Sequence, residues 1–275
     1  MDDHHICVRD WLKQSVLERT EAESALCFVL QQSRSYLFAH GDAVLTKDQT
    51  DRLHHIQDRR QSGEPLAYIT GSIEFWSLSF DVSPAVLIPR DDTGCLVEVG
   101  LGLIKQVPKT GVIVDAGTGS GVIAIAFAHE TGLKVTAIDQ SEAALRVAEQ
   151  NAMRLTPGLV SCQHGNWLAE FPKRSVRLLL SNPPYIANAD PHLNAPELQH
   201  EPQSALVAGA DGLDDIRILA SQATLALVSG GALAIEHGYD QGQAVRHIFE
   251  SVGFKSVTTV QDLAGHDRVT HARAS

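Results

Sequence analysis

A strand that runs straight into a glycine-rich turn and then an apolar helix is the feature that most constrains the fold of this chain. The apolar residues 112–114 lead through Asp115 into Gly-Thr-Gly-Ser-Gly at 117–121, and an apolar run follows at 122–128. Glycines in such a turn let the backbone approach a ligand closely, and the following helix offers free N–H groups. A dinucleotide fingerprint would need glycine where this chain has Val122. The pattern therefore predicts a ligand-binding turn and makes a nicotinamide dehydrogenase the least favoured reading.

Strands and helices alternate after this turn, which predicts an α/β, doubly wound sheet. Ligands of such sheets bind outside the carboxyl ends of the strands. The expected strands are 112–115, 135–139, 159–163, 176–181 and 231–236, followed by an antiparallel pair at 255–261 and 267–272. The expected helices are 121–130, 141–153, 213–228 and 240–251.

Polar residues follow two more of the expected strands. Asp139 ends the second strand, where a carboxylate can accept hydrogen bonds from both hydroxyls of a ribose. Ser141 can cap the next helix, which leaves Asp139 free for a ligand. Asn166 and Trp167 follow residues 159–163 and could bracket an adenine ring, although a core tryptophan is an equal alternative.

A stiff turn, Ser181-Asn182-Pro183-Pro184-Tyr185, follows the strand expected at 176–181. Consecutive prolines fix φ at about −65° and push the residues before them into extended geometry. The turn then displays two acceptors, Asn182 Oδ1 and the Pro183 carbonyl, which suit the two hydrogens of a planar –NH₂ group, with Tyr185 packed on its face. A plain proline-rich turn is the alternative.

The glycine turn, with an acidic residue two positions before its first glycine, resembles motif I of class I S-adenosylmethionine (SAM) methyltransferases. Together with the Asn-Pro-Pro-Tyr motif, the chain resembles the release-factor glutamine N5-methyltransferases from about residue 8 to the C-terminus. Further stretches that carry the resemblance are 63–71, 74–76, 82–90, 201–206, 236–238 and 262–268.

The resemblance implies a seven-stranded class I methyltransferase sheet and a set of site residues. The implied catalytic residues are Asn182, Pro183, Pro184 and Tyr185. The implied cofactor-binding residues are Asp115, Gly117, Thr118, Gly119, Ser120, Gly121, Asp139, Asn166, Trp167 and Asn182, with SAM as the cofactor. No metal site is expected.

Four positions, in three stretches, depart from the family pattern. The usual Arg-Pro-(Asp/Glu)-Thr-Glu is Arg-Asp-Asp-Thr-Gly at 90–94, the usual acidic residue before Trp167 is Asn166, and the usual aromatic residue before Glu201 is His200. None of them touches the glycine turn or the Asn182 motif. We expect these departures to affect the exact position of the cofactor and of the substrate loop more than the class of reaction.

Three segments are predicted. Residues 1–67 form a helical, substrate-docking domain, with capping boxes at Thr20/Glu23 and Thr46/Gln49. Residues 68–84 form a β-hairpin linker, with alternation over 68–83, and residues 85–275 form the methyltransferase domain. The long connection 186–212 is expected to be either a lid held by Glu201 or a disordered insert.

Composition narrows the partners and the compartment. The formal net charge is −11, whereas binding to a bare phosphate backbone needs a cationic surface, so we expect no direct nucleic-acid partner. The four cysteines show no metal or redox spacing, which indicates reduced thiols in a cytoplasmic protein. No apolar run reaches membrane length, and no signal-like N-terminus is present, so no membrane association is expected. We expect a monomer.

By resemblance, the predicted reaction is SAM-dependent N5-methylation of the glutamine in the Gly-Gly-Gln loop of peptide-chain release factors, which modulates translation termination. The alternatives are glutamine methylation of a ribosomal protein, adenine N6-methylation of nucleic acid, and a non-catalytic SAM-binding module. The acidic charge argues against nucleic acid, and the intact Asn182 motif argues against a module that only binds.

Overall fold

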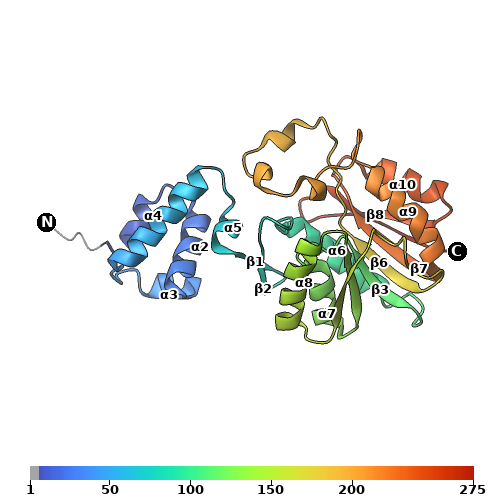
Figure 1. Cartoon of the computed structure of the whole chain (residues 1–275), viewed down its shortest axis with the longest axis horizontal. Coiled ribbons are helices and arrows are strands. Elements are labelled where there is room, and N and C mark those ends of the chain that lie inside the picture. The colour runs from blue at the N-terminus through green and yellow to red at the C-terminus, as the bar shows by residue number, and fades with distance from the viewer. Residues whose placement is uncertain (1–5) are drawn as a thin grey trace. The chain divides into compact units, whose positions relative to one another are not determined.

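The structure is a computed structural model that describes residues 6–275, and these residues form two compact units, one that ends at Gly71 and one that runs from Ser72 to Ser275 (Figure 1). The predicted three-part division at 67/68 and 84/85 stays a prediction about domain organisation. None of the helices among the described residues is both long and apolar enough to cross a membrane.

The first unit is helical. It contains α1 (Val8–Gln14), α2 (Arg19–Leu30), α3 (Arg34–Ala39), α4 (Lys47–Gln61) and α5 (Leu66–Thr70). Trp11, Leu26 and Leu53 are among the apolar side chains that form its buried core. The unit therefore has a hydrophobic core of its own.

One of the two predicted capping boxes in this unit is present. Thr46 accepts a hydrogen bond from the Gln49 N–H, and the Gln49 side chain accepts one from the Thr46 N–H, so α4 begins as predicted. The box at Thr20 and Glu23 was wrong. Helix α2 begins at Arg19 with Glu18 as its N-cap, and Glu23 pairs with Arg19 at 2.6 Å, one helical turn away. Thr20 therefore lies inside the helix and cannot cap it. The Glu23 carboxylate, which the predicted capping box required, is paired with Arg19 at i, i+4 instead.

The second unit begins with an antiparallel hairpin of β1 (Ser72–Phe75) and β2 (Leu78–Asp81). The turn residues Trp76 and Ser77 have φ of 54° and 56°, the left-handed pair that matches strand twist in a two-residue turn. The hairpin predicted over 68–83 is thus present at 72–81. The prediction of a hairpin is wrong for residues 68–70, which lie in α5. The Pro65 carbonyl accepts hydrogen bonds from the N–H groups of residues 68 and 69, and these bonds start a helical turn.

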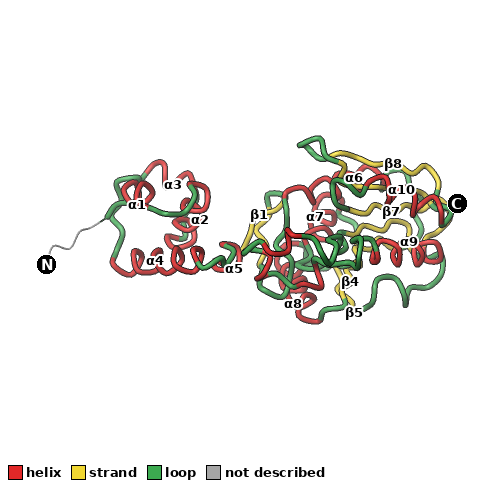
Figure 2. The backbone as a smooth tube through the Cα atoms, turned by 90° about the horizontal axis from the view of Figure 1, so that it is seen from above, coloured by secondary structure: helices red, strands yellow, loops and turns green. Residues whose placement is uncertain are grey.

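A seven-stranded sheet forms the centre of the second unit, with the strand order β5-β4-β3-β6-β7-β9-β8 (Figures 1 and 2). Its parallel strands are β3 (Val112–Ala116), β4 (Val135–Asp139), β5 (Val160–His164), β6 (Val176–Ser181) and β7 (Leu227–Glu236). The antiparallel pair is β8 (Lys255–Gln261) and β9 (Asp267–Arg273), and β9 also runs antiparallel to β7. The predicted doubly wound sheet with a terminal antiparallel pair is confirmed.

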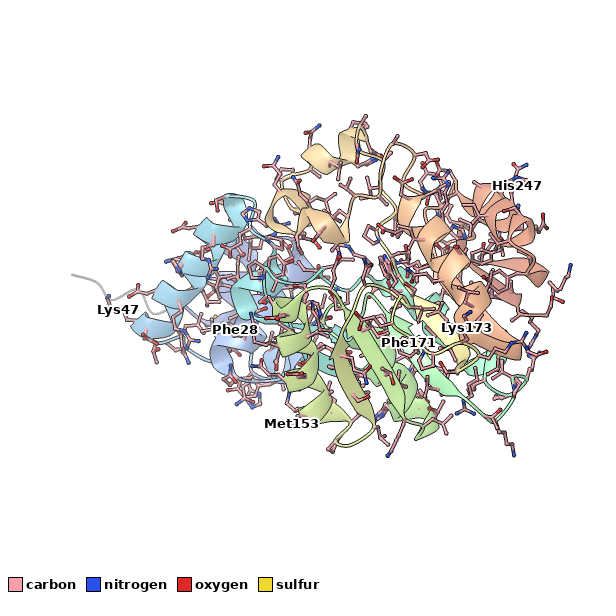
Figure 3. The ribbon with its side chains drawn as sticks, turned by 45° about the vertical axis from the view of Figure 1, so that its right-hand side comes forward. Phe28, Lys47, Met153, Phe171, Lys173 and His247 are labelled. Atoms are coloured by element: carbon pink, nitrogen blue, oxygen red, sulfur yellow. The ribbon has the colours of Figure 1, made fainter. Side chains whose placement is uncertain are left out.

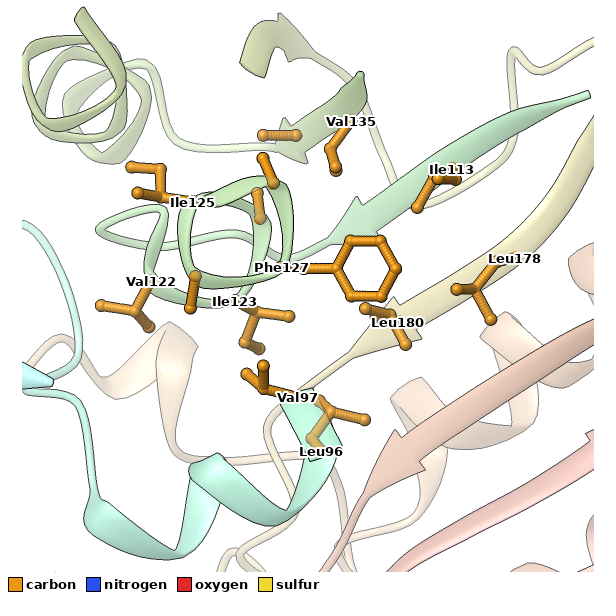
Figure 4. Packing of buried hydrophobic residues seen from close by; sticks show 14 of the residues in the cluster. Leu96, Val97, Ile113, Val122, Ile123, Ile125, Phe127, Val135, Leu178 and Leu180 are labelled. Carbon is orange, nitrogen blue, oxygen red and sulfur yellow. The ribbon is translucent and has the colours of Figure 1, made fainter. Parts of the chain in front are cut away.

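Helices cover both faces of this sheet. One face packs against α6 (Gly94–Leu103), α7 (Val122–Thr131) and α8 (Glu142–Leu155), and the other against α9 (Asp214–Ala226) and α10 (Gly242–Ser251). On the first face Phe127 points from α7 toward Leu178 and Leu180 of β6 (Figure 4). On the outer sides, Met153 of α8 and His247 of α10 point into solvent (Figure 3).

The predicted boundaries hold within a few residues except at β7. This strand begins at Leu227, four residues before the predicted start, and the helix before it ends at Ala226. Gly230 has φ of 73°, and the pairing of β6 with β7 shifts register between Val176 and Leu178. A left-handed glycine lets the strand bend and continue, which the apolar pattern did not indicate.

The topology defines where a ligand can sit. The chain builds the sheet outward from β3 through β4 to β5, then crosses to the other side of β3 to form β6. The carboxyl ends of β3 and β6 are therefore the point at which the strand order reverses. Doubly wound sheets bind ligands at this point.

Candidate active site

A cleft with a cavity volume of about 140 Å³ opens at the carboxyl ends of β3, β4 and β6. The predicted site residues that line it are Gly117, Thr118, Gly119, Ser120, Asp139, Asn166, Trp167, Asn182 and Pro184. Asp115, Gly121, Pro183 and Tyr185 are not among the lining residues.

The glycine turn is held by main-chain hydrogen bonds. The N–H groups of Gly117 and Thr118 both donate to the Ile138 carbonyl, at 2.8 and 2.9 Å. Gly119 has φ of 56°, and a Cβ placed on it would meet no atom within 4 Å, so this residue faces open space in the cleft. Gly121 has φ of 87°, and a Cβ there would lie 2.9 Å from Ile125 Cδ1. The two glycines thus serve different needs, which are ligand approach at Gly119 and helix packing at Gly121.

Asp115 supports the turn from below. It is fully buried, and its Oδ2 accepts from the Thr118 hydroxyl at 2.6 Å and from the Ala124 N–H at 3.1 Å. Its Oδ1 has no hydrogen-bond partner among the described residues. Burial raises the pKa of this carboxyl to about 7, although the bonds from Thr118 and Ala124 oppose the shift.

Asp139 lies in the wall of the cleft, as the sequence predicted. Its Oδ2 accepts from the Gly119 N–H and its Oδ1 from the Ser141 N–H, both at 2.9 Å. Ser141 caps α8 by accepting from the Ala144 N–H, so the capping role predicted for it is confirmed. A carboxylate oxygen has room for more than one donor. Asp139 can therefore receive ligand hydroxyls while it holds the turn.

Trp167 is fixed by two neighbours. A Cβ on Gly117 would lie 2.8 Å from the Trp167 ring, so glycine is needed there for the ring to fit. Asp215 accepts a side-chain hydrogen bond from Trp167. Trp167 and Asn166 both line the cleft, and Trp167 has φ of 53°. The tryptophan is thus a rigid wall of the cleft.

The Asn182 side chain has its two ends in different environments. Its Nδ2 donates to the Thr93 hydroxyl at 3.2 Å. No donor among residues 6–275 bonds to its Oδ1, and Asn182 lines the cleft. The strand end beneath it is fixed because the Ser181 hydroxyl donates to the Ala116 carbonyl at 2.6 Å. The acceptor that the sequence predicted at Asn182 is therefore available.

The rest of the motif divides between the cleft and its support. Pro184 lines the cleft, and the Pro183 carbonyl receives no hydrogen bond from the described part of the chain. Tyr185 points elsewhere: its hydroxyl lies 3.5 Å from Glu236 Oε1, and its carbonyl accepts from Gln241 Nε2 at 2.9 Å. Burial raises the pKa of the Tyr185 hydroxyl above its usual range. The structure thus places Tyr185 beneath the site.

The long connection 186–212 has defined backbone pairing across the residues that the structure describes. It contains three short 3₁₀ helices, and the N–H groups of residues 186 and 188 donate to the carbonyls of 206 and 209. Glu201 is buried, accepts from the Ile88 N–H at 3.0 Å, and binds the Arg90 guanidinium. Pro202, Ser204 and Ala205 line the cleft next to it. The segment is therefore ordered and held by Glu201, and its role as a lid stays a prediction.

Sequence reasoning missed several lining residues because their contribution depends on tertiary packing. Thr93 and Arg90 come from the segment before α6, and Gln140, Ser141 and Ala144 come from the start of α8. Residues 82–90 had been recognised only as a family stretch. No group of three or more His, Cys, Asp or Glu in residues 6–275 is arranged to hold a metal ion. The four cysteines are free thiols, and burial raises the pKa of Cys95 and of Cys162 to about 11.

Comparisons with known proteins cover both units. Two family models match, the PrmC N-terminal domain over residues 8–71 and the Methyltransferase small domain over residues 99–211. The release factor glutamine methyltransferase of Vibrio cholerae serotype O1 is 46% identical over 252 residues, which cover 91% of this chain and 87% of that protein. The protein of the same name from Escherichia coli K12 is 39% identical over 271 residues, which cover 96% and 97%.

One solved structure, the ribosomal protein L11 methylase from Lactobacillus delbrueckii subsp. bulgaricus, superposes with a TM-score of 0.51 at 20% identity. The match covers 70% of this chain and 84% of that one, and it shows the fold alone. The sequence matches go further, because they run over more than nine tenths of this chain at about twice that identity. The chain therefore belongs to the release factor glutamine methyltransferase family.

Proposed function

We propose that this chain transfers the methyl group of SAM to the side-chain amide nitrogen of a glutamine in a peptide-chain release factor. The observation that carries the proposal is the Asn182 side chain, whose Nδ2 is tied to Thr93 while its Oδ1 has no donor among the described residues and borders the cleft. An acceptor held in this way suits an N–H group of the substrate. The relatives that match more than nine tenths of this chain in sequence carry this activity in their name.

The target within the release factor is the glutamine of its Gly-Gly-Gln loop, so the reaction modulates translation termination. This assignment rests on the family resemblance and on the match of residues 8–71 to the PrmC N-terminal domain. The helical unit is the candidate docking element for the release factor. We place the enzyme in the cytoplasm as a monomer, with no direct nucleic-acid partner, in keeping with its net charge of −11.

The part of the cleft formed by residues 117–121, Asp139, Asn166 and Trp167, here called the donor side, fits SAM. When bound, SAM supplies a methyl group on a positively charged sulfur. A ligand can approach the main chain of the turn closely at Gly119, since a Cβ there would meet no atom within 4 Å. Asp139 can accept from the ribose hydroxyls, and Asn166 and Trp167 can flank the adenine. Asp115 takes part through Thr118, which it holds from beneath.

The acceptor side supplies orientation and charge stabilisation. A primary amide nitrogen is a poor nucleophile because its lone pair is delocalised. Asn182 Oδ1 and the Pro183 carbonyl can each accept one of its hydrogens, which holds the nitrogen in line with the reacting bond at about 3 Å. The same two dipoles stabilise the positive charge that grows on the nitrogen during transfer. Pro184 also borders the cleft. After transfer the methylated nitrogen loses one proton to water or another acceptor, so no general base is assigned.

The test is to incubate the purified full chain with SAM and a release factor, and to map added methyl groups by mass spectrometry. One methyl group on the glutamine of the Gly-Gly-Gln loop is the expected result. Methylation of a ribosomal-protein glutamine in its place would overturn the substrate assignment but keep the chemistry. No methylation of any candidate substrate, with SAM binding confirmed by calorimetry, would leave a non-catalytic SAM-binding module.

A further inference from the structure

Glu236 is a buried carboxylate for which the reaction described above has no use. It ends β7 and is 1% exposed. Its Oε1 lies 3.5 Å from the Tyr185 hydroxyl, and its Oε2 has no partner in normal hydrogen-bond geometry among residues 6–275. Burying a carboxylate with so few partners costs stability.

Thr93 connects this carboxylate to the cleft. Burial raises the pKa of the Glu236 carboxyl, and a side-chain hydrogen bond from Thr93 opposes this rise, so the two side chains are neighbours. The Thr93 hydroxyl oxygen accepts from Asn182 Nδ2 at 3.2 Å. Thr93 is 2% exposed and lies in a short 3₁₀ helix, Asp91–Thr93. That helix is anchored, since Asp92 pairs with Arg268 at 3.0 Å.

The side chains of Glu236, Thr93 and Asn182 form a line in which one direction of hydrogen bonding is favoured. An ionised carboxylate can only accept, so it turns the Thr93 O–H toward itself. The lone pairs of the Thr93 oxygen then face Asn182, where only the Nδ2 end of the amide can meet them. The Oδ1 end must therefore point the other way, into the cleft.

We propose that Glu236 and Thr93 are positioning residues for methyl transfer, which fix the flip state of the Asn182 amide so that its oxygen faces the substrate. The inference rests on the proposed function and deepens it. Without the line, the Asn182 amide can rotate, and in half of its orientations it presents –NH₂ to the substrate –NH₂. Neither Glu236 nor Thr93 needs to touch the substrate to have this effect.

The protonation state of Glu236 should therefore appear in the rate. Burial raises its pKa to about 7, while Thr93 and Arg268 oppose the shift and Asp92 adds to it. The other groups that face it are the Tyr185 hydroxyl, whose pKa is raised, and Arg268, which stays charged. A protonated Glu236 can donate to Thr93 and reverse the polarity of the line. The wild-type kcat should consequently fall as the pH decreases through about 7.

The experiment compares Thr93→Val, Thr93→Ser and Glu236→Gln in the full chain, with SAM and the release factor as substrates. T93V keeps the shape but removes the hydroxyl, and we expect kcat to fall about 10- to 100-fold while the Kd for SAM stays within about threefold. T93S restores the hydroxyl and should recover most of the rate. E236Q can present either an oxygen or an –NH₂ to Thr93, so kcat should fall and lose its dependence on pH between about 6 and 8.

Thr156→Val is the matched control, because Thr156 is buried and its hydroxyl has no partner among the described residues. It should leave kcat unchanged. A T93V enzyme with wild-type kcat, or a T93S enzyme as slow as T93V, would overturn the proposal. If T93V does not fold, E236Q decides, and a wild-type rate and pH profile in E236Q would reject the role. A wild-type chain that methylates no release factor would contradict the proposed function instead, before any variant is compared.

Discussion

The two sides of the cleft are built in different ways. On the donor side (residues 117–121, Asp139, Asn166 and Trp167), the polar groups are fixed mainly by backbone hydrogen bonds, such as those from Gly117 and Thr118 to the Ile138 carbonyl. On the acceptor side (Thr93, Asn182, Pro183 and Glu236), a line of side chains fixes a single amide. Main-chain groups that the fold holds in place shape a surface for binding SAM. A side-chain amide can rotate, so other side chains must hold it in the orientation that the reaction needs. We therefore expect substitutions on the donor side to change SAM affinity and substitutions on the acceptor side to change the rate.

Asn182→Ala should have the largest effect. It removes an acceptor whose bonds to the substrate strengthen in the transition state, so methyl transfer should fall by about 10²- to 10³-fold. The Kd for SAM, measured by calorimetry, should stay within about tenfold of wild type. Near-normal turnover in this variant would show that the acceptor side does not carry the rate.

Asp139→Ala tests the donor side and should show the opposite pattern. Loss of a charge-assisted acceptor for ligand hydroxyls should weaken SAM binding about 10- to 100-fold, with a smaller effect on kcat once SAM is saturating. The Asp139 bonds to the Gly119 and Ser141 N–H groups are lost as well, so Asp139→Asn, which keeps one oxygen, is the control. An unchanged Kd in both variants would return Asp139 to a purely structural role.

Gly119 and Gly121 lie in the same turn but have different roles: Gly119 leaves room for the ligand, and Gly121 allows α7 to pack. Gly121→Ala places a Cβ 2.9 Å from Ile125 Cδ1 and 3.3 Å from Ala148 Cβ at φ of 87°, so it should lower the free energy of unfolding by about 1–3 kcal/mol. Gly119→Ala meets no atom within 4 Å, so its stability should fall less, by about 1 kcal/mol, while SAM affinity decreases. Urea unfolding and calorimetry give the two quantities. Equal losses of stability in the two variants would contradict this division.

The sequence predicted the donor side better than the acceptor side, for a physical reason. The turn at 117–121 and the cap at Ser141 are local, so the residue types at those positions are sufficient to indicate them. The partners of Asn182 are distant along the chain: Thr93 lies 89 residues before it, and Tyr185 meets Glu236 across 51 residues. Only the folded sheet brings β6, β7 and the segment before α6 together. The same limit explains the early start of β7, which depends on the conformation of Gly230.

Asp115, which holds the glycine turn from beneath, links the donor side of the cleft to stability. Its pKa of about 7 in the folded chain lies above its ordinary value of 3.8, so between about pH 4 and pH 7 the folded state binds more protons than the unfolded state. The free energy of unfolding should therefore decrease as the pH rises through this range, by at most about 1.4 kcal/mol per pH unit from this group. Glu236 adds a slope of the same sign.

Asp115→Asn removes the titrating proton and keeps an oxygen for the Thr118 and Ala124 bonds, so its stability should depend less on pH than that of the wild type. Urea unfolding at about pH 5, 6, 7 and 8 measures the difference. E236Q should flatten the same curve, and the double variant should flatten it further because neither carboxyl is among the groups that shift the pKa of the other. A slope unchanged in D115N would mean that Asp115 stays ionised beneath the turn. Thr118 would then be held by a full negative charge, and SAM binding should be unaffected by pH over this range.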